Sequence, residues 1–315
     1  MKKRYQAIEK RTERFLRHLF VKLDRIHLPG FQGNSIYSVG QLFVKGLMEG
    51  FVTERAASVA FSFFTALFPL LLFSFTLIPY IPIDSFQENL LNYLHEIIPP
   101  QIWKIIDDTI TYIVTRKSGN LLSVSVILSL YFGTNGINSL FTAFRQTYHR
   151  YTNASNWLKN RLYSLIILVL IFGLMLISVV VLGVGNYILT VSYEQAIISD
   201  FFHILFNIIT FAAAVLTVMI AVATIYFFGS SKPRKFKIFT PGTITTTTLI
   251  ALTTLGFNYY ITNFSRYNIL YGSLGTILIL TFYLYLNAVF ILIGFEINTS
   301  IRAAEKSKEQ KMARM

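Results

Sequence analysis

The sequence predicts an all-α, polytopic membrane protein, and its composition is the first reason. Of the 315 residues, 54% are hydrophobic and only 14% are charged, whereas a soluble domain carries about 25% charged residues. Mean hydropathy is +0.55. The second reason is that several apolar stretches reach the roughly 20 residues that a helix needs to cross a bilayer. Cysteine is absent, which excludes disulfides and thiolate metal sites.

Six apolar stretches are long enough to be transmembrane helices, and each is bounded by charge, Pro or Gly. They cover residues 56–79, 121–144, 162–189, 202–228, 239–263 and 272–298. The second and fifth are the least regular, because Asn135 and Asn138 interrupt one and a threonine run at residues 245–248 lies in the other. The sequence therefore predicts six spans joined by short loops and one longer loop.

The distribution of Lys and Arg predicts the orientation of these spans. Of the 28 basic residues, 24 lie in residues 1–55, 145–161, 229–237 and 302–315, on one side of the predicted membrane. Basic residues mark cytoplasmic loops, so both termini are expected in the cytoplasm. The start MKKRYQAIEKRTERFLRHLF lacks the apolar core of a cleavable signal. Topology thus accounts for the net charge of +13, and no nucleic-acid partner is expected.

Three regions are expected along the chain. Residues 1–34 form a cytoplasmic arm and linker, residues 35–300 the membrane domain, and residues 301–315 a basic cytoplasmic tail. Within the arm, residues 8–26 place apolar side chains on one helical face and charged ones on the other. Such a helix lies on an anionic leaflet or packs on the protein's own cytoplasmic surface; both alternatives remain open.

The loop at residues 84–117 is too polar to span, yet its apolar residues recur at helical spacing on both sides of Pro99-Pro100. It is expected to form a helical hairpin on the extracytoplasmic side. The hairpin would cap a cavity or shield the bundle.

Polar side chains form stripes along spans one, two, five and six, since residues three and four apart share a helical face. We expect these stripes to face protein or water, not lipid, and to line a polar path. The candidate residues are Arg55, Ser58, Ser62, Thr65, Asn135, Asn138, Thr254, Asn258, Tyr283 and Asn287. The alternative is plain helix packing, in which hydroxyls and amides bond to neighbouring helices.

Glu296 is the only acid within a predicted span, and we expect it to form an ion pair with Arg55 at a similar depth. Proton coupling through a chain of mid-membrane carboxylates is therefore not expected. The five His residues form no HExxH pattern, and no GxSxG elbow or Walker loop is present. The sequence predicts no enzyme, no catalytic residue, no cofactor and no metal site.

The stretch YGSLG at residues 271–275 contains a GxxG pattern, which some RNA-binding modules use to clamp a backbone. Here it begins the sixth span at the outer membrane face, away from cytoplasmic RNA. Arg266, Tyr271, Gly272 and Ser273 are instead candidates for contact with a lipid headgroup at a helix start. The alternative is a tight turn with close helix contact.

Several motifs carry a family resemblance: RAASVAF at residues 55–61, GTNGINSLFTAF at 133–144, YGSLG at 271–275 and GFEIN at 294–298. With Pro241-Gly242, they make residues 35–300 resemble the YihY/BrkB family of bacterial inner-membrane proteins. The resemblance implies a six-helix protein of the cytoplasmic membrane, with some members linked to serum resistance or envelope lipid handling. Arg145-Gln146 departs from the Asn that many members carry.

The resulting expectation is a transporter or lipid-handling protein of the bacterial envelope, whose partners are membrane lipids and an unidentified lipid or small-molecule substrate. The oligomeric state is not predicted. One alternative is a membrane scaffold that recruits envelope machinery through its basic surface or the hairpin. The other is the ribonuclease BN label that many family members bear, which implies tRNA processing and which we regard as misassigned.

Overall fold

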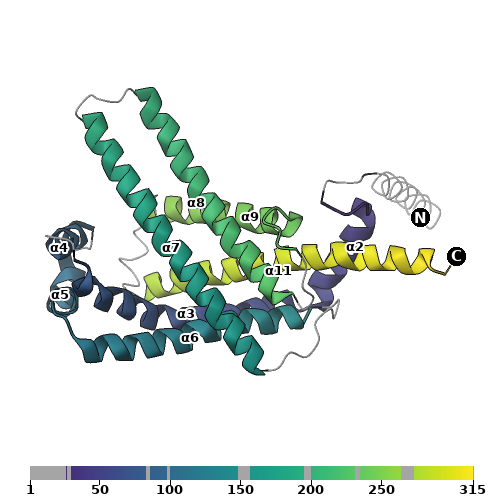
Figure 1. The fold of residues 1–315 in the computed structure, drawn as a ribbon, viewed down its shortest axis with the longest axis horizontal. Coiled ribbons are helices and arrows are strands. Elements are labelled where there is room, and N and C mark those ends of the chain that lie inside the picture. The colour runs from purple at the N-terminus through teal and green to yellow at the C-terminus, as the bar shows by residue number, and fades with distance from the viewer. Residues whose placement is uncertain are drawn as a thin grey trace, which may run out of the picture.

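The computed structural model describes residues 26, 30–82, 86–97, 100–147, 157–194, 200–230, 235–263 and 273–314. Every regular element in these ranges is a helix, and none is a strand (Figure 1). The prediction of an all-α membrane protein is confirmed. The amphipathic face at residues 8–26 lies almost wholly outside the described residues.

One helix covers each predicted span. These helices are α3 (Val52–Leu77), α6 (Gly119–Arg145), α7 (Trp157–Glu194), α8 (Asp200–Gly229), α9 (Pro241–Asn263) and α11 (Ser273–Met312). With 40 residues, α11 is roughly 60 Å long at 1.5 Å per residue. It therefore exceeds the bilayer core of about 30 Å and continues as a helix through most of the predicted tail.

Among the described residues, five helices are long and apolar enough to cross a membrane, and they belong to α3, α6, α7, α8 and α11. The helix α9 is 23 residues long but is not among them. The threonine run at residues 245–248 lowers the hydropathy of α9. The same run made this stretch one of the two least regular in the sequence. The count of six spans stays a prediction.

The crossing of α9 can be tested with reporters fused after residue 315. If all six helices cross and the amino terminus is cytoplasmic, a C-terminal green fluorescent protein will fluoresce and a C-terminal alkaline phosphatase will be inactive. The same two reporters inserted after residue 230, between α8 and α9, should also report a cytoplasmic location. An active phosphatase at the C-terminus alone would show that α9 does not cross.

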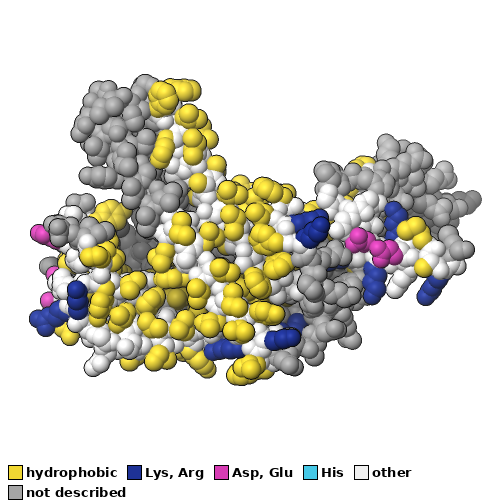
Figure 2. Space-filling view, in the orientation of Figure 1, with side chains coloured by type: hydrophobic (Ala, Val, Ile, Leu, Met, Phe, Trp, Pro, Cys, Tyr) yellow, Lys and Arg dark blue, Asp and Glu magenta, His cyan; other side chains and the backbone are white. Residues whose placement is uncertain are grey.

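The helices pack around α3, α6 and α11. The helix α3 lies along α6, α11 packs against α3 and α9, and α7 contacts both α6 and α8. Phe144 of α6 stacks on Phe295 of α11 with ring centroids 3.9 Å apart. Figure 1 shows α7 and α8 leaning away from the other long helices. Hydrophobic side chains cover much of the visible surface of the bundle (Figure 2), as contact with lipid requires.

Shorter helices lie at the two ends of this bundle (Figure 1). At one end, α2 (Ile36–Glu49) packs against α11, and Ser35 caps it by accepting a hydrogen bond from the Ser38 amide at 3.2 Å. At the other end are η1 (Ile78–Tyr80), α4 (Phe86–Ile97) and α5 (Pro100–Thr115). The last two contact each other and occupy the loop predicted as a hairpin, whose outer location stays a prediction.

Candidate functional site

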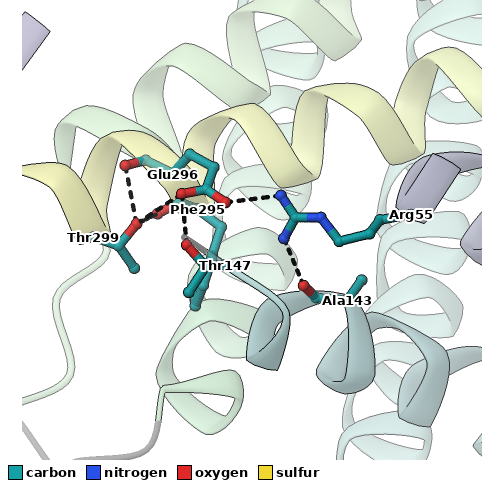
Figure 3. A network of polar contacts seen from close by, with 6 residues as sticks. All are labelled: Arg55, Ala143, Thr147, Phe295, Glu296 and Thr299. Carbon is teal, nitrogen blue, oxygen red and sulfur yellow. Dashed lines mark hydrogen bonds and ion pairs between the residues drawn. The ribbon is translucent and has the colours of Figure 1, made fainter. Parts of the chain in front are cut away.

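A buried ion pair joins α3 to α11. Glu296 is completely buried and Arg55 is 6% exposed. The Nη2 atom of Arg55 donates to Oε1 of Glu296 at 2.9 Å, and its Nη1 donates to the carbonyl oxygen of Ala143 at 2.7 Å (Figure 3). The structure thus brings together the two residues that the sequence predicted to pair, and it adds a contact to α6.

The second carboxylate oxygen of Glu296 also has partners. Thr147, just after α6, donates from Oγ1 to Oε2 at 2.7 Å, and Thr299 lies 3.4 Å from the same oxygen (Figure 3). Charged groups are rarely buried unless they are paired and hydrogen-bonded. This network therefore ties three segments together at the end of the bundle that carries α2. Sequence reasoning missed Thr147, because a single Thr after a helix end gives no periodic signal.

A polar hollow of about 400 Å³ lies between α3 and α6, and we call it the α3–α6 groove. Its lining residues are Arg55, Ser58, Ser62, Asn135, Asn138, Ser139, Thr142, Ala143 and Gln146. Five of these belong to the predicted polar path. Ser58 and Thr142 are exposed, so the groove opens at the surface of the protein. Thr65 is not among the lining residues and donates to the carbonyl oxygen of Ser62 at 3.0 Å.

Two buried polar atoms of groove residues have no hydrogen-bond partner in the described part of the chain. They are Nε of Arg55 and Oγ of Ser139. Buried polar groups nearly always have partners, and an unsatisfied one costs about 1–3 kcal/mol. Both residues line the groove, so a small movement of their side chains would bring one N–H donor and one hydroxyl to a bound polar group. Ser139 was missed although it lies four residues after Asn135 and three before Thr142, a spacing that places it on the same helical face.

Arg161 of α7 lies at the edge of the groove. Its Nη1 donates to Oδ1 of Asn135, its Nη2 donates to the carbonyl oxygen of Tyr131 at 3.4 Å, and its guanidinium lies 5.2 Å from the Tyr131 ring centroid. The sequence treated Arg161 as one of the charges of a cytoplasmic loop. Nothing in the sequence indicated that α7 would bring it to Asn135.

The other predicted path residues lie elsewhere, on α9 and α11. Thr254 Oγ1 and Tyr283 Oη are 2.9 Å apart, and Asn287 Nδ2 donates to the carbonyl oxygen of Tyr283 at 2.8 Å. Asn258 is exposed on α9. None of these four lines the α3–α6 groove. The structure thus distributes the candidate residues between a groove and a separate α9–α11 contact.

The predicted headgroup contact comprises four residues. Arg266, Tyr271 and Gly272 lie outside the described residues, and Ser273 is the first residue of α11.

Comparison with known proteins decides the family. The chain matches the family Virulence factor BrkB over residues 43–315. The chain belongs to the BrkB family. BrkB-family relatives include the ribonuclease-like protein YfkH of Bacillus subtilis, which is 24% identical over 257 residues, 82% of this chain and 92% of YfkH. A UPF0761 membrane protein of Alteromonas mediterranea is 25% identical over 281 residues, 86% of this chain and 90% of the relative. No solved structure matches the chain.

The family and the five long apolar helices support a multi-pass membrane protein. The word ribonuclease belongs to the name of YfkH. Among the residues that the structure describes, no group of three or more His, Cys, Asp or Glu side chains is placed to hold a metal ion.

Proposed function

We propose that the protein is a transporter or lipid-handling protein of the bacterial inner membrane, with both termini in the cytoplasm. In this proposal the α3–α6 groove binds the polar part of the substrate. One observation carries the proposal. The groove between two long apolar helices is lined by Arg55 and Ser139, whose Nε and Oγ atoms are buried and have no partner in the described residues.

The free-energy cost of leaving polar groups without hydrogen-bond partners supports this assignment. The hydroxyls of Ser62 and Thr142 donate to carbonyl oxygens of their own helices, but Arg55 Nε and Ser139 Oγ have no partner in the described residues, and acyl chains against the groove would leave both unsatisfied. Polar residues at membrane depth mark substrate pathways. Glu296 balances the charge of Arg55, so the base of the groove offers hydrogen bonds without uncompensated charge. Such a lining fits hydroxyl, carbonyl or phosphodiester oxygens of a small polar solute or a lipid headgroup.

Reconstitution into proteoliposomes tests the proposal, with fluorescent lipids of several headgroups and labelled solutes as probes. In Asn138→Ala and Ser139→Ala we expect the movement of the transported probe to fall about tenfold, equivalent to about 1.4 kcal/mol in the barrier, because each change removes a hydrogen-bonding group from the groove. Ser123→Ala is the matched control, since Ser123 lies exposed on the same helix and, among the described residues, its hydroxyl donates to the Gly119 carbonyl alone.

Two results would contradict the proposal. If no probe moves or binds, or if the groove variants behave like Ser123→Ala, the groove is not a path. A scaffold role would then be favoured if charge reversal in residues 2–25 abolishes the cellular phenotype.

We also propose that the protein has no enzymatic activity and binds no nucleic acid. Metal-dependent RNA cleavage by the purified protein, lost on replacing a specific acid or His, would overturn that part.

A further inference from the structure

A second hollow lies where α8 ends and α9 begins, and we call it the basic pocket. It has a volume of about 540 Å³, and its lining includes Lys235, Lys237 and Arg302. The described residues that line it include no Asp or Glu. Because three cations converge without an acidic lining residue, the pocket favours an anion.

Local structure explains why the cations converge. Residues 235–237 have no helical conformation, and alternate residues of an extended segment lie on the same side. Lys235 and Lys237 therefore both line the pocket, while the ring of Phe236 contacts Phe227 of α8 at a centroid distance of 5.6 Å. Arg302 comes from α11, and its Nη1 donates to Oγ of Ser230 at 2.5 Å.

Hydrogen bonds hold the start of α9 in place where it lines the basic pocket. Asn298 of α11 accepts a hydrogen bond from the Gly242 amide at 3.0 Å and donates to Oγ1 of Thr240 at 3.0 Å. Thr240 Oγ1 also accepts from the Thr243 amide at 3.1 Å. These first amides of α9 already have partners, so a bound anion would be held by the basic side chains and not by the helix end.

An apolar hollow of about 650 Å³ adjoins the basic pocket. Its lining includes Phe31, Val39, Gly40, Phe43, Ile244 and Ile297. The two hollows share Gly30, Phe239 and Pro241, so a basic region and an apolar region meet along one border. A molecule that fills both must be anionic at one end and apolar at the other.

We propose that the basic pocket and the apolar hollow together bind one anionic phospholipid. Its phosphate lies among Lys235, Lys237 and Arg302, and an acyl chain lies in the apolar hollow beside α2. Basic pockets at the cytoplasmic ends of membrane helices suit such headgroups, and these residues lie on the side that the charge distribution predicts to be cytoplasmic. The site shares no lining residue with the α3–α6 groove, so it does not depend on the function proposed for the groove.

Binding to the full-length protein in a neutral detergent tests the site. The probes are dihexanoyl phosphatidylglycerol, the phosphatidylcholine with the same chains, and glycerol 3-phosphate. We expect phosphatidylglycerol to bind at least tenfold more tightly than either of the others. The Lys235→Gln/Lys237→Gln variant should weaken that binding about tenfold, and Lys235→Arg/Lys237→Arg should retain it. Lys117→Gln/Lys159→Gln is the control, because both lysines are exposed outside the site and should change binding less than twofold.

A substitution in the apolar hollow separates a lipid from a soluble phosphate. Gly40 lines the hollow and a Cβ atom added there meets nothing within 4 Å, so Gly40→Leu places a bulky apolar group at the wall of the hollow. It should weaken phosphatidylglycerol binding and leave glycerol 3-phosphate unchanged. Equal affinity for the two phospholipids, or equal losses in the lysine variant and its control, overturns the proposal. Glycerol 3-phosphate binding as tightly as the lipid, with Gly40→Leu silent, overturns the lipid assignment in favour of a soluble phosphate.

Discussion

Replacing Glu296 with Leu is expected to lower the free energy of unfolding by about 3–5 kcal/mol. The substitution leaves the Arg55 guanidinium buried without its counter-charge, and Thr147 loses the acceptor at 2.7 Å. Solvation cannot compensate, because Glu296 is completely buried and Arg55 nearly so. Unfolding of the purified protein in mixed micelles, followed by circular dichroism, measures the change.

A double substitution separates the ion pair from general damage. Removing both charges in Arg55→Met/Glu296→Leu should restore much of the loss, because buried pairs replaced by apolar residues are often near neutral. If the double variant instead loses as much unfolding free energy as Arg55→Met and Glu296→Leu lose together, the two residues act independently. Glu54→Gln is the control, because Glu54 is exposed one residue away and should change stability by no more than about 0.5 kcal/mol.

Gly294→Ala is the second substitution with a large expected effect, a loss of roughly 3 kcal/mol. A Cβ atom there would collide with the hydroxyls of Thr246 and Tyr226 and with the Gly242 carbonyl. Two of these groups lie on α9, so the helices α9 and α11 would have to separate. Their closest approach depends on small residues, as is common between membrane helices. The same unfolding measurement applies.

Gly256 provides the matched control for Gly294. It also lies within a long helix, but a Cβ atom added there meets nothing within 4 Å. Gly256→Ala should therefore be neutral or stabilise the protein by up to about 1 kcal/mol, because Ala favours helix more than Gly does. If the two alanine variants unfold alike, α9 and α11 are not in backbone contact at Gly294.

Helix positions were predictable from the sequence because they depend on local composition and periodicity. Each apolar stretch became one long helix, and the 3.6-residue period placed Ser58 with Ser62 and Asn135 with Asn138 on shared faces. The proximity of Arg55 and Glu296 also followed from one rule, since a lone acid within a span needs a basic partner.

Which faces meet was not predictable, because that depends on packing between distant segments. Helical periodicity grouped Thr254 and Tyr283 with the groove residues, although they contact each other on α9 and α11. Arg161 reaches Asn135 only through the packing of α7 on α6. The basic pocket combines residues near positions 30, 235 and 302, and no local pattern relates these three segments.

Because α11 is one continuous helix, it carries residues that serve both proposed binding regions. Glu296, which anchors Arg55 at the base of the groove, and Arg302, which lines the basic pocket, are six residues apart on it, or roughly 9 Å along its axis. An axial or rotational displacement of α11 would move both side chains together. If binding at one region changes the affinity of the other through this helix, binding at the second region must change the affinity of the first by the same factor.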